Sequence, residues 1–254
     1  MVRYTDFIIG KIVKSLEDNG MLDNTYLIFT TDNGTSNGII GKRDEVYVRG
    51  GKSFLTENGI NAPFLVLTPD KMHFTTDALI DFTDIYPTLL DLANVGNKAE
   101  TSGYSFADVL KGERVDGKRD WILAMGGLSA KIGEDDRMEN WFRYRDRVLR
   151  DRRYKVYTDT LKRIVRVFDL QSDPYETHNL IGEGTSAQVL EKFEGILNGL
   201  PDRDAKPVYT KTVDSLYNVP IEKLNCCGGP KGARKTNMLP LATEEAFLKL
   251  SSKE

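Results

Sequence analysis

The sequence predicts an α/β fold followed by a small antiparallel subdomain, and two patterns carry this prediction. A helical pattern over residues 4–20 precedes a short apolar run at 25–31, the helix-then-strand order expected of an α/β sheet. Further on, segments 154–157 and 164–168 alternate apolar and charged side chains, which is typical of antiparallel strands with one solvated face. We expect residues 1–125 to form the α/β part, 126–200 a small α+β subdomain, and 201–254 an extension over the surface.

The first elements are justified by their spacing. Tyr4, Phe7, Ile8 and Ile12 recur at helical intervals, and Gly20 is a suitable helix stop. The apolar, β-branched run at 25–31 reads as a buried strand, and a second strand is expected at 64–68.

Helix-capping residues and proline positions help to predict the later elements. A helix at 81–94 has Asp81 or Thr83 as its cap and tolerates Pro87 only near its start. The remaining expected elements are a helical turn at 105–110, a strand at 121–125, a helix at 187–197 and a short helix at 244–250. The arginine-rich stretch 143–153 is interpreted as a solvated strand face rather than a nucleic-acid patch.

Composition excludes several classes of protein. The chain has 254 residues and a net charge of −3, with 29% charged residues, so no basic field favours nucleic acid. Its two cysteines, Cys226 and Cys227, are adjacent and form neither a disulfide framework nor a Cys-x-x-Cys metal motif. No apolar run reaches the length of a membrane span.

Polar residues follow the predicted strand at 25–31. Asp32 and Asn33 offer oxygen ligands for a hard cation, although Asp-Asn-Gly is also a common turn sequence. A Gly-rich loop then leads to Gly50-Gly51-Lys52. Because ligands bind beyond the carboxyl ends of strands in open α/β sheets, we expect the chemistry to lie here.

Taken together, these motifs resemble the type I sulfatase family of the alkaline phosphatase superfamily. Four stretches carry the resemblance, in chain order: TDNG at 31–34, GK at 51–52 with TENGINAPF at 56–64, DIYPTLLDLA at 84–93, and FDLQSDPYETHNL at 168–180. The resemblance implies part of an alkaline-phosphatase-like central sheet with flanking helices, then an antiparallel-sheet subdomain with a C-terminal helix.

The resemblance also implies a site. Asp32 and Asn33 would be metal ligands, with calcium the expected divalent cation, and Lys52 would contact the sulfate. In the family, a formylglycine made from a Cys/Ser-x-Pro-x-Arg motif is the nucleophile, and the substrate is a sulfated small molecule or glycan. A full-length member is expected to be periplasmic or secreted.

The chain departs from the family in its earlier motifs. It has no Cys/Ser-x-Pro-x-Arg sequence and no early Asp-Asp metal pair, and both histidines, His73 and His178, follow the Asp-Asn motif. We interpret them as loop and surface or capping residues. The arginine of the family's Glu-Gly-Gly-x-Arg is Asn61 here. Every motif from Asp32 onward is present, so we expect the C-terminal part of a sulfatase, truncated at its start, inactive alone and prone to self-association.

Two other functions fit the same residues. One is a phosphonate or phosphodiester hydrolase of the same superfamily, and the other is a non-catalytic ion-binding module. If the sulfatase interpretation is right, the Lys52 ammonium should lie within roughly 10 Å of the Asp32 carboxylate or the Asn33 amide, facing a common cleft with one wall missing.

Overall fold

The computed structural model describes residues 2–96, 100–126, 131–132, 138–140, 143–182, 184–204 and 241–251. The chain folds into two compact units, each built from separated stretches of sequence. Unit 1 comprises Met1–Asp32 and Ala62–Ile122, and unit 2 comprises Asn33–Asn61 and Leu123–Glu254. The domain limits expected from the sequence stay a prediction.

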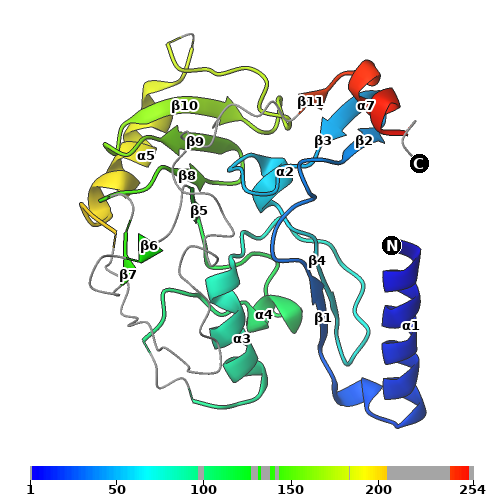
Figure 1. Cartoon of the computed structure of the whole chain (residues 1–254). Coiled ribbons are helices and arrows are strands. Elements are labelled where there is room, and N and C mark those ends of the chain that lie inside the picture. The colour runs from blue at the N-terminus through cyan, green and yellow to red at the C-terminus, as the bar shows by residue number, and fades with distance from the viewer. Residues whose placement is uncertain are drawn as a thin grey trace. The chain divides into compact units, whose positions relative to one another are not determined.

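Unit 1 contains the predicted helix and both predicted strands of the first half (Figure 1). Helix α1 spans Val2–Asp18, and the 3-10 helix η1 spans Leu22–Asn24. Strands β1 (Leu27–Thr30) and β4 (Phe64–Leu67) pair antiparallel, with Leu27 opposite Leu67. The 3-10 helix η2 (Phe82–Asp84) leads into α3 (Ile85–Leu92), and α4 covers Ala107–Leu110.

The core of unit 1 lies between the sheet and α4. Phe106, Val109 and Leu110 are buried, and Phe64 packs edge-on against Phe106 with ring centroids 5.7 Å apart. Partly buried apolar side chains surround them: Tyr26, Val66, Ile80 and Leu92. Burial of these groups is the main stabilising contribution of this unit.

Helix α1 confirms the predicted helix and its stop. It ends at Asp18, and Gly20 takes the left-handed backbone conformation (φ 64°) that favours glycine after a helix. None of its residues is buried, and Tyr4 and Phe7 are 65% and 55% exposed. Self-association through such a face stays a prediction. Among the described helices, none combines the length and the hydrophobicity that a transmembrane span requires.

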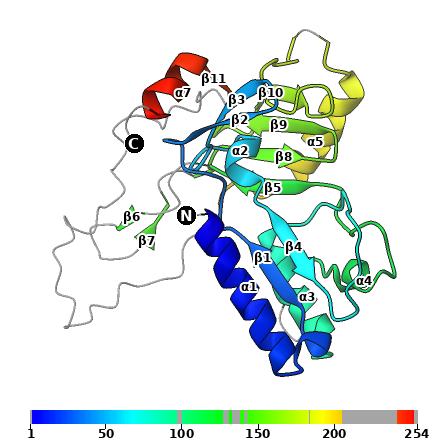
Figure 2. The ribbon, with the colours of Figure 1, turned by 90° about the vertical axis from the view of Figure 1, so that its right-hand side faces the viewer.

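Unit 2 holds a four-stranded antiparallel sheet in the order β10-β9-β8-β5. The strands are β5 (Ile122–Met125), β8 (Arg147–Arg150), β9 (Tyr154–Thr158) and β10 (Ile164–Asp169). Figures 1 and 2 place α5 (Ala187–Gly199) against one face of it and the short α2 (Glu57–Ile60) by the other. A two-stranded sheet, β6 (Lys131–Ile132) with β7 (Met138–Glu139), completes this part.

The expectation of one solvated face on this sheet is wrong. Val148 and Leu149, neighbours on β8, are 1% and 0% exposed, so both faces are covered. Arg147 is buried as well, and its guanidinium lies 2.6 Å from Asp204. The charged residues of the alternating pattern therefore include buried, ion-paired groups, which hydrophobic alternation alone cannot distinguish from solvated ones.

A second sheet of unit 2 was not expected from the sequence. β2 (Ile40–Arg43) and β3 (Val46–Arg49) form a hairpin where the sequence predicted a polar loop, and β11 (Leu241–Ala242) adds to β3. The exposed hairpin has many charged side chains and no long apolar run, so the sequence pattern does not predict its strands. Helix α7 (Glu244–Ser251) confirms the predicted C-terminal helix, and its Phe247 ring lies 5.1 Å from that of Tyr47. Cys226 and Cys227 lie outside the described residues.

Candidate functional site

The predicted metal ligands follow β1, as expected. The Asp32 side chain is exposed and Asn33 is half-buried. Carboxylate and amide oxygens suit a hard cation, and calcium takes six to eight of them. Within the described ranges no group of three or more His, Cys, Asp or Glu side chains could hold a metal. Asp32 and Asn33 therefore fit a calcium site only as part of a larger ligand set.

The loop after Asn33 returns on itself within unit 2. The Lys52 amide donates to the Thr35 carbonyl at 2.9 Å, and the Gly50 amide donates to the Ile39 carbonyl at 2.9 Å. These bonds place the backbone of Lys52 beside the residues that directly follow Asn33. The separation between the Lys52 ammonium and the Asp32 carboxylate stays a prediction.

Close backbone packing explains the glycines of this loop. A Cβ atom on Gly34 would lie 1.8 Å from the Asn58 carbonyl oxygen, and one on Gly51 would lie 2.5 Å from the Gly59 nitrogen. Atoms cannot approach so closely, so any side chain here would push the backbone segments apart. The loop is thereby held against α2.

Lys52 itself projects from this loop into solvent. Its side chain is exposed, and its ammonium has no hydrogen bond or ion pair among the residues with described positions. An unpaired ammonium on a well-packed loop is chemically suited to contact an anionic oxygen as a point charge.

A buried charge cluster lies beside α2, and the hydrophobic pattern of the sequence does not predict it. Lys155 on β9 is 0% exposed, and its Nζ lies 3.0 Å from both Glu57 Oε1 and Glu176 Oε1. The Tyr157 hydroxyl donates to Glu176 Oε1 at 2.5 Å. Burial, and next the nearby Glu176 carboxylate, raise the pKa of Tyr157 well above its ordinary value, so this phenol stays protonated.

The cluster joins two motifs that are far apart in the sequence. Glu57 belongs to the TENG stretch and Glu176 to the DPYE stretch, and Glu176 Oε2 accepts from the Glu57 amide at 2.6 Å. Both glutamates carry the family resemblance, which could have singled them out. Lys155 lies outside the family motifs, and its charge fitted the alternating pattern that was interpreted as the solvated face of a strand.

Residues that depart from the family motif lie close to this cluster. Asn61, which stands at the motif's arginine position, is exposed and donates to Glu57 Oε2 at 3.3 Å. Arg150 Nε lies 3.6 Å from the same oxygen. A guanidinium thus reaches the Glu57 carboxylate from β8 in the described structure.

The two histidines lie as expected. His73 is exposed in a loop of unit 1. His178 is also exposed, and its amide donates to Asp173 Oδ2 at 2.8 Å, which caps the DPYE turn.

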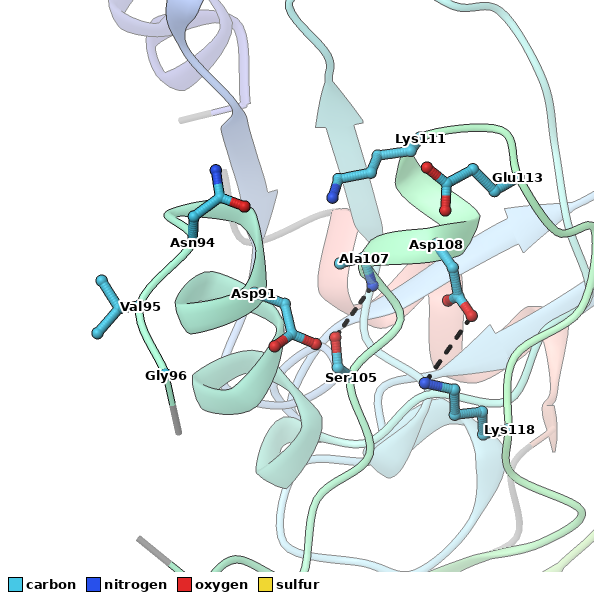
Figure 3. A pocket seen from close by; sticks show the side chains of 10 residues that line it. All are labelled: Asp91, Asn94, Val95, Gly96, Ser105, Ala107, Asp108, Lys111, Glu113 and Lys118. Atoms are coloured by element: carbon cyan, nitrogen blue, oxygen red, sulfur yellow. Dashed lines mark hydrogen bonds and ion pairs between the residues drawn. The ribbon is translucent and has the colours of Figure 1, made fainter. Parts of the chain in front are cut away.

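Unit 1 contains a shallow surface pocket of about 440 Å³ between the end of α3 and α4, shown in Figure 3. Lys118 lies 3.8 Å from Asp108 there, while the Ala107 amide donates to the Ser105 hydroxyl at 3.3 Å. Asp91, Asp108 and Glu113 offset the charges of Lys111 and Lys118. None of the predicted site residues lines this pocket, and its three carboxylates outnumber its two ammonium groups, so it has no preference for a sulfate.

The fold matches several solved structures. A protein bound to its substrate D-glucosamine-2-N,6-O-disulfate superposes with a TM-score of 0.61 at 22% identity, over 78% of this chain and 38% of that one. A phosphonate monoester hydrolase from Silicibacter pomeroyi gives 0.56 at 22% identity, over 76% of this chain and 38% of that one. The chain therefore has the alkaline-phosphatase-like fold.

The sequence comparisons then identify the family. A sulfatase family model matches residues 1–95, and a model described as N-sulphoglucosamine sulphohydrolase, C-terminal, matches residues 50–202. The chain belongs to the sulfatase family.

Two curated relatives illustrate the match. Arylsulfatase K of Gallus gallus is 28% identical over 71% of this chain and 32% of its own length. N-acetylglucosamine-6-sulfatase of Capra hircus is 38% identical over 42% of this chain and 18% of its own length. The chain thus spans a third or less of the length of these two relatives.

Proposed function

We propose that this chain supplies part of a sulfatase site that hydrolyses sulfate esters of sugars. Lys52 would contact a sulfate oxygen, and Asp32 with Asn33 would contribute oxygen ligands to a divalent cation, expected to be calcium. The observation that supports this most is the return of the Gly50–Lys52 backbone to Thr35, just beyond Asn33. Membership of the sulfatase family supports the assignment of the three residues.

The chemistry of the three side chains matches the needs of sulfate ester cleavage. Negative charge on the sulfate oxygens and the leaving oxygen must be stabilised, and a fixed ammonium does this without reorganisation. When bound, the cation would add positive charge at the same oxygens. Asp32 would hold it by charge and Asn33 through a neutral carbonyl oxygen.

A sulfated sugar is the proposed substrate class. One relative is named N-acetylglucosamine-6-sulfatase, and one solved structure with this fold holds a disulfated glucosamine as its substrate. We therefore expect glucosamine 6-sulfate to bind at least as well as inorganic sulfate, because its ring adds contacts to those of the anion.

Binding of inorganic sulfate in the presence of calcium tests the proposal by calorimetric titration. Lys52→Ala should weaken sulfate binding about tenfold or more, because the variant loses one charge-assisted hydrogen bond to the anion. Lys42→Ala is the matched control, since Lys42 is an exposed lysine of the same segment that pairs with Glu45 at 3.5 Å. Equal weakening by both variants, or no sulfate binding by the parent chain, would contradict the proposal.

The chain alone should not turn over an aryl sulfate, even with calcium. No Cys/Ser-x-Pro-x-Arg sequence occurs among its 254 residues, and removal of a covalent nucleophile lowers rates by several orders of magnitude. Turnover that disappears in Lys52→Ala would show instead that another group of this chain acts as the nucleophile.

Phosphonate ester hydrolysis is the second candidate, supported by the shared fold of the Silicibacter pomeroyi enzyme. Titration with methylphosphonate separates the two. Sulfate should bind more tightly than methylphosphonate if the site is a sulfatase site, and the reverse order would favour the phosphonate hydrolase.

A further inference from the structure

The Lys155 cluster has a charge arrangement that stability alone does not explain. One fully buried ammonium is shared by two carboxylates, each 3.0 Å away. Removing charges from water is costly, and apolar side chains of similar size often stabilise a protein as well as a buried ion pair does. We therefore looked for a segment of the chain whose position depends on this cluster.

The cluster fixes the start of α2. Glu57 is the first residue of this helix, and its carboxylate is bound by Lys155 while its amide donates to Glu176 at 2.6 Å. The side chain of Glu57 is thus bound to β9 of the four-stranded sheet, and its backbone is bound to Glu176 in the segment that follows β10. A helix of a single turn has little stability of its own, so these bonds determine where it lies.

Helix α2 in turn fixes the loop that carries Lys52. Asn58 of α2 donates through Nδ2 to the Arg49 carbonyl at 2.8 Å, at the end of β3. Gly59 and Gly51 approach so closely that a Cβ on Gly59 would lie 2.3 Å from the Gly51 carbonyl oxygen. Arg49 and Gly51, the residues on either side of Gly50, are therefore in direct contact with the helix.

We propose that Lys155 is a positioning residue for Lys52, acting through Glu57, Glu176 and α2. The relation to sulfate binding rests on the function proposed for Lys52, whereas the effect on the loop does not. Loss of the Lys155 charge should release α2 from the sheet and let the Gly50–Lys52 segment move, so that the Lys52 ammonium no longer holds one position.

The test combines two variants of the full chain with a matched control. Lys155→Met removes the ammonium, and Lys155→Met with Glu176→Gln removes one charge of each sign, which guards against a failure to fold. Thr88→Val is the control in unit 1, because the buried Thr88 hydroxyl donates to the Asp84 carbonyl at 2.6 Å, far along the chain from the cluster.

Hydrogen exchange at single amides gives the direct measurement. The Lys52 amide, bonded to Thr35, should exchange about tenfold faster in both Lys155 variants, while amides of the β9–β10 ladder keep their protection. Thr88→Val should leave the Lys52 amide unchanged. Unchanged exchange at Lys52, or equal loss of protection in β9 and β10, would overturn the proposal, since the second result means that Lys155 only stabilises the sheet.

Sulfate titration of the same variants distinguishes this proposal from the function proposed above. If both hold, the dissociation constant for sulfate rises about tenfold in the double variant and stays unchanged in Thr88→Val. If the parent chain binds no sulfate but the Lys52 amide still exchanges faster in the variants, the proposed function fails and the positioning role stands.

Discussion

Two buried clusters of opposite charges among the described residues differ in construction, one around Asp84 in unit 1 and one around Lys155 in unit 2. In unit 1, Arg119 binds Asp84 through two parallel hydrogen bonds, Nε to Oδ2 and Nη2 to Oδ1, both at 2.6 Å. Asp84 also accepts the amides of Asp81 and Tyr104 at 2.9 and 2.7 Å. In unit 2, Lys155 is shared between Glu57 and Glu176.

The Asp84 cluster is local in the sequence, whereas the Lys155 cluster joins segments that are far apart in the sequence. One cation meets one anion in unit 1, over residues 81–119. In unit 2 two carboxylates share one ammonium, with Arg150 at 3.6 Å from Glu57 as a further cation, over residues 57–176. A bidentate arginine–carboxylate pair fixes the geometry of two side chains and is suited to a purely structural role. A lysine shared by two carboxylates joins segments that are far apart in the sequence. We therefore infer that the Asp84 cluster stabilises the fold of unit 1, whereas the Lys155 cluster supports the loop of the candidate site.

Lys155→Met should cause the largest loss of stability, about 3–5 kcal/mol, because two buried carboxylates lose their shared partner. Urea unfolding followed by circular dichroism measures it. The double variant with Glu176→Gln should recover part of this loss. A loss below about 1 kcal/mol in the single variant would mean that the carboxylates find other partners.

Asp84→Asn should rank next, with a loss of about 2–3 kcal/mol, since Arg119 becomes a buried cation without an anion. The expected consequence is confined to unit 1: amides of α3 should lose protection from hydrogen exchange while those of β9 and β10 keep theirs. Loss of protection in both units would show that the two clusters are coupled.

Tyr157→Phe should have a smaller effect, about 1–2 kcal/mol, because it removes one hydrogen bond to a carboxylate and leaves the ring in place. The ring packs edge-on against Phe168 with centroids 5.7 Å apart, so the apolar contacts persist. Thermal unfolding of this variant beside Lys155→Met would separate the contribution of the phenol from that of the ammonium.

The smallest effect is expected at Asp169, and it should depend on pH. The hydrogen bond from Arg153 lowers the pKa of Asp169 in the folded chain. A lowered pKa stabilises the fold above the unfolded value of about 3.9, and this contribution disappears as pH falls through the folded pKa. Asp169→Asn should therefore cost less than about 1 kcal/mol at neutral pH, the pair being partly exposed. The difference from the parent chain should vanish in acid; a difference that grew in acid would contradict this.

Much of the fold could be predicted from local patterns. The spacing of Phe7, Ile8 and Ile12 predicted α1, and Asp81 was expected as a cap; it accepts the Thr83 amide at 2.8 Å. Pro87 lies near the start of α3, where its missing amide hydrogen does no harm. These features depend on neighbours in sequence, which is why a single sequence contains them.

What the sequence could not predict depends on partners far along the chain. The β2–β3 hairpin has charged exposed residues such as Lys42 and Arg43 and acquires β11 from residues 241–242. Lys155 is buried only because Glu57 and Glu176 meet there. For the candidate site, the position of Asp32, Asn33 and Lys52 after a predicted strand and the motif resemblance together selected these residues, and the structure adds the backbone return of the loop.

The interleaved composition of the two units has a consequence for the order of folding during synthesis. Residues 33–61 emerge from the ribosome early, but the bonds that fix α2 come from Lys155 and Glu176, about a hundred residues later. Long-range closures of this kind form late, after local elements. Meanwhile residues 62–122 can join the first 32 and complete unit 1. The Lys52 loop is thus expected to become ordered only when most of the chain has been made, so a ribosome stalled before residue 155 would present it unanchored to cellular proteases.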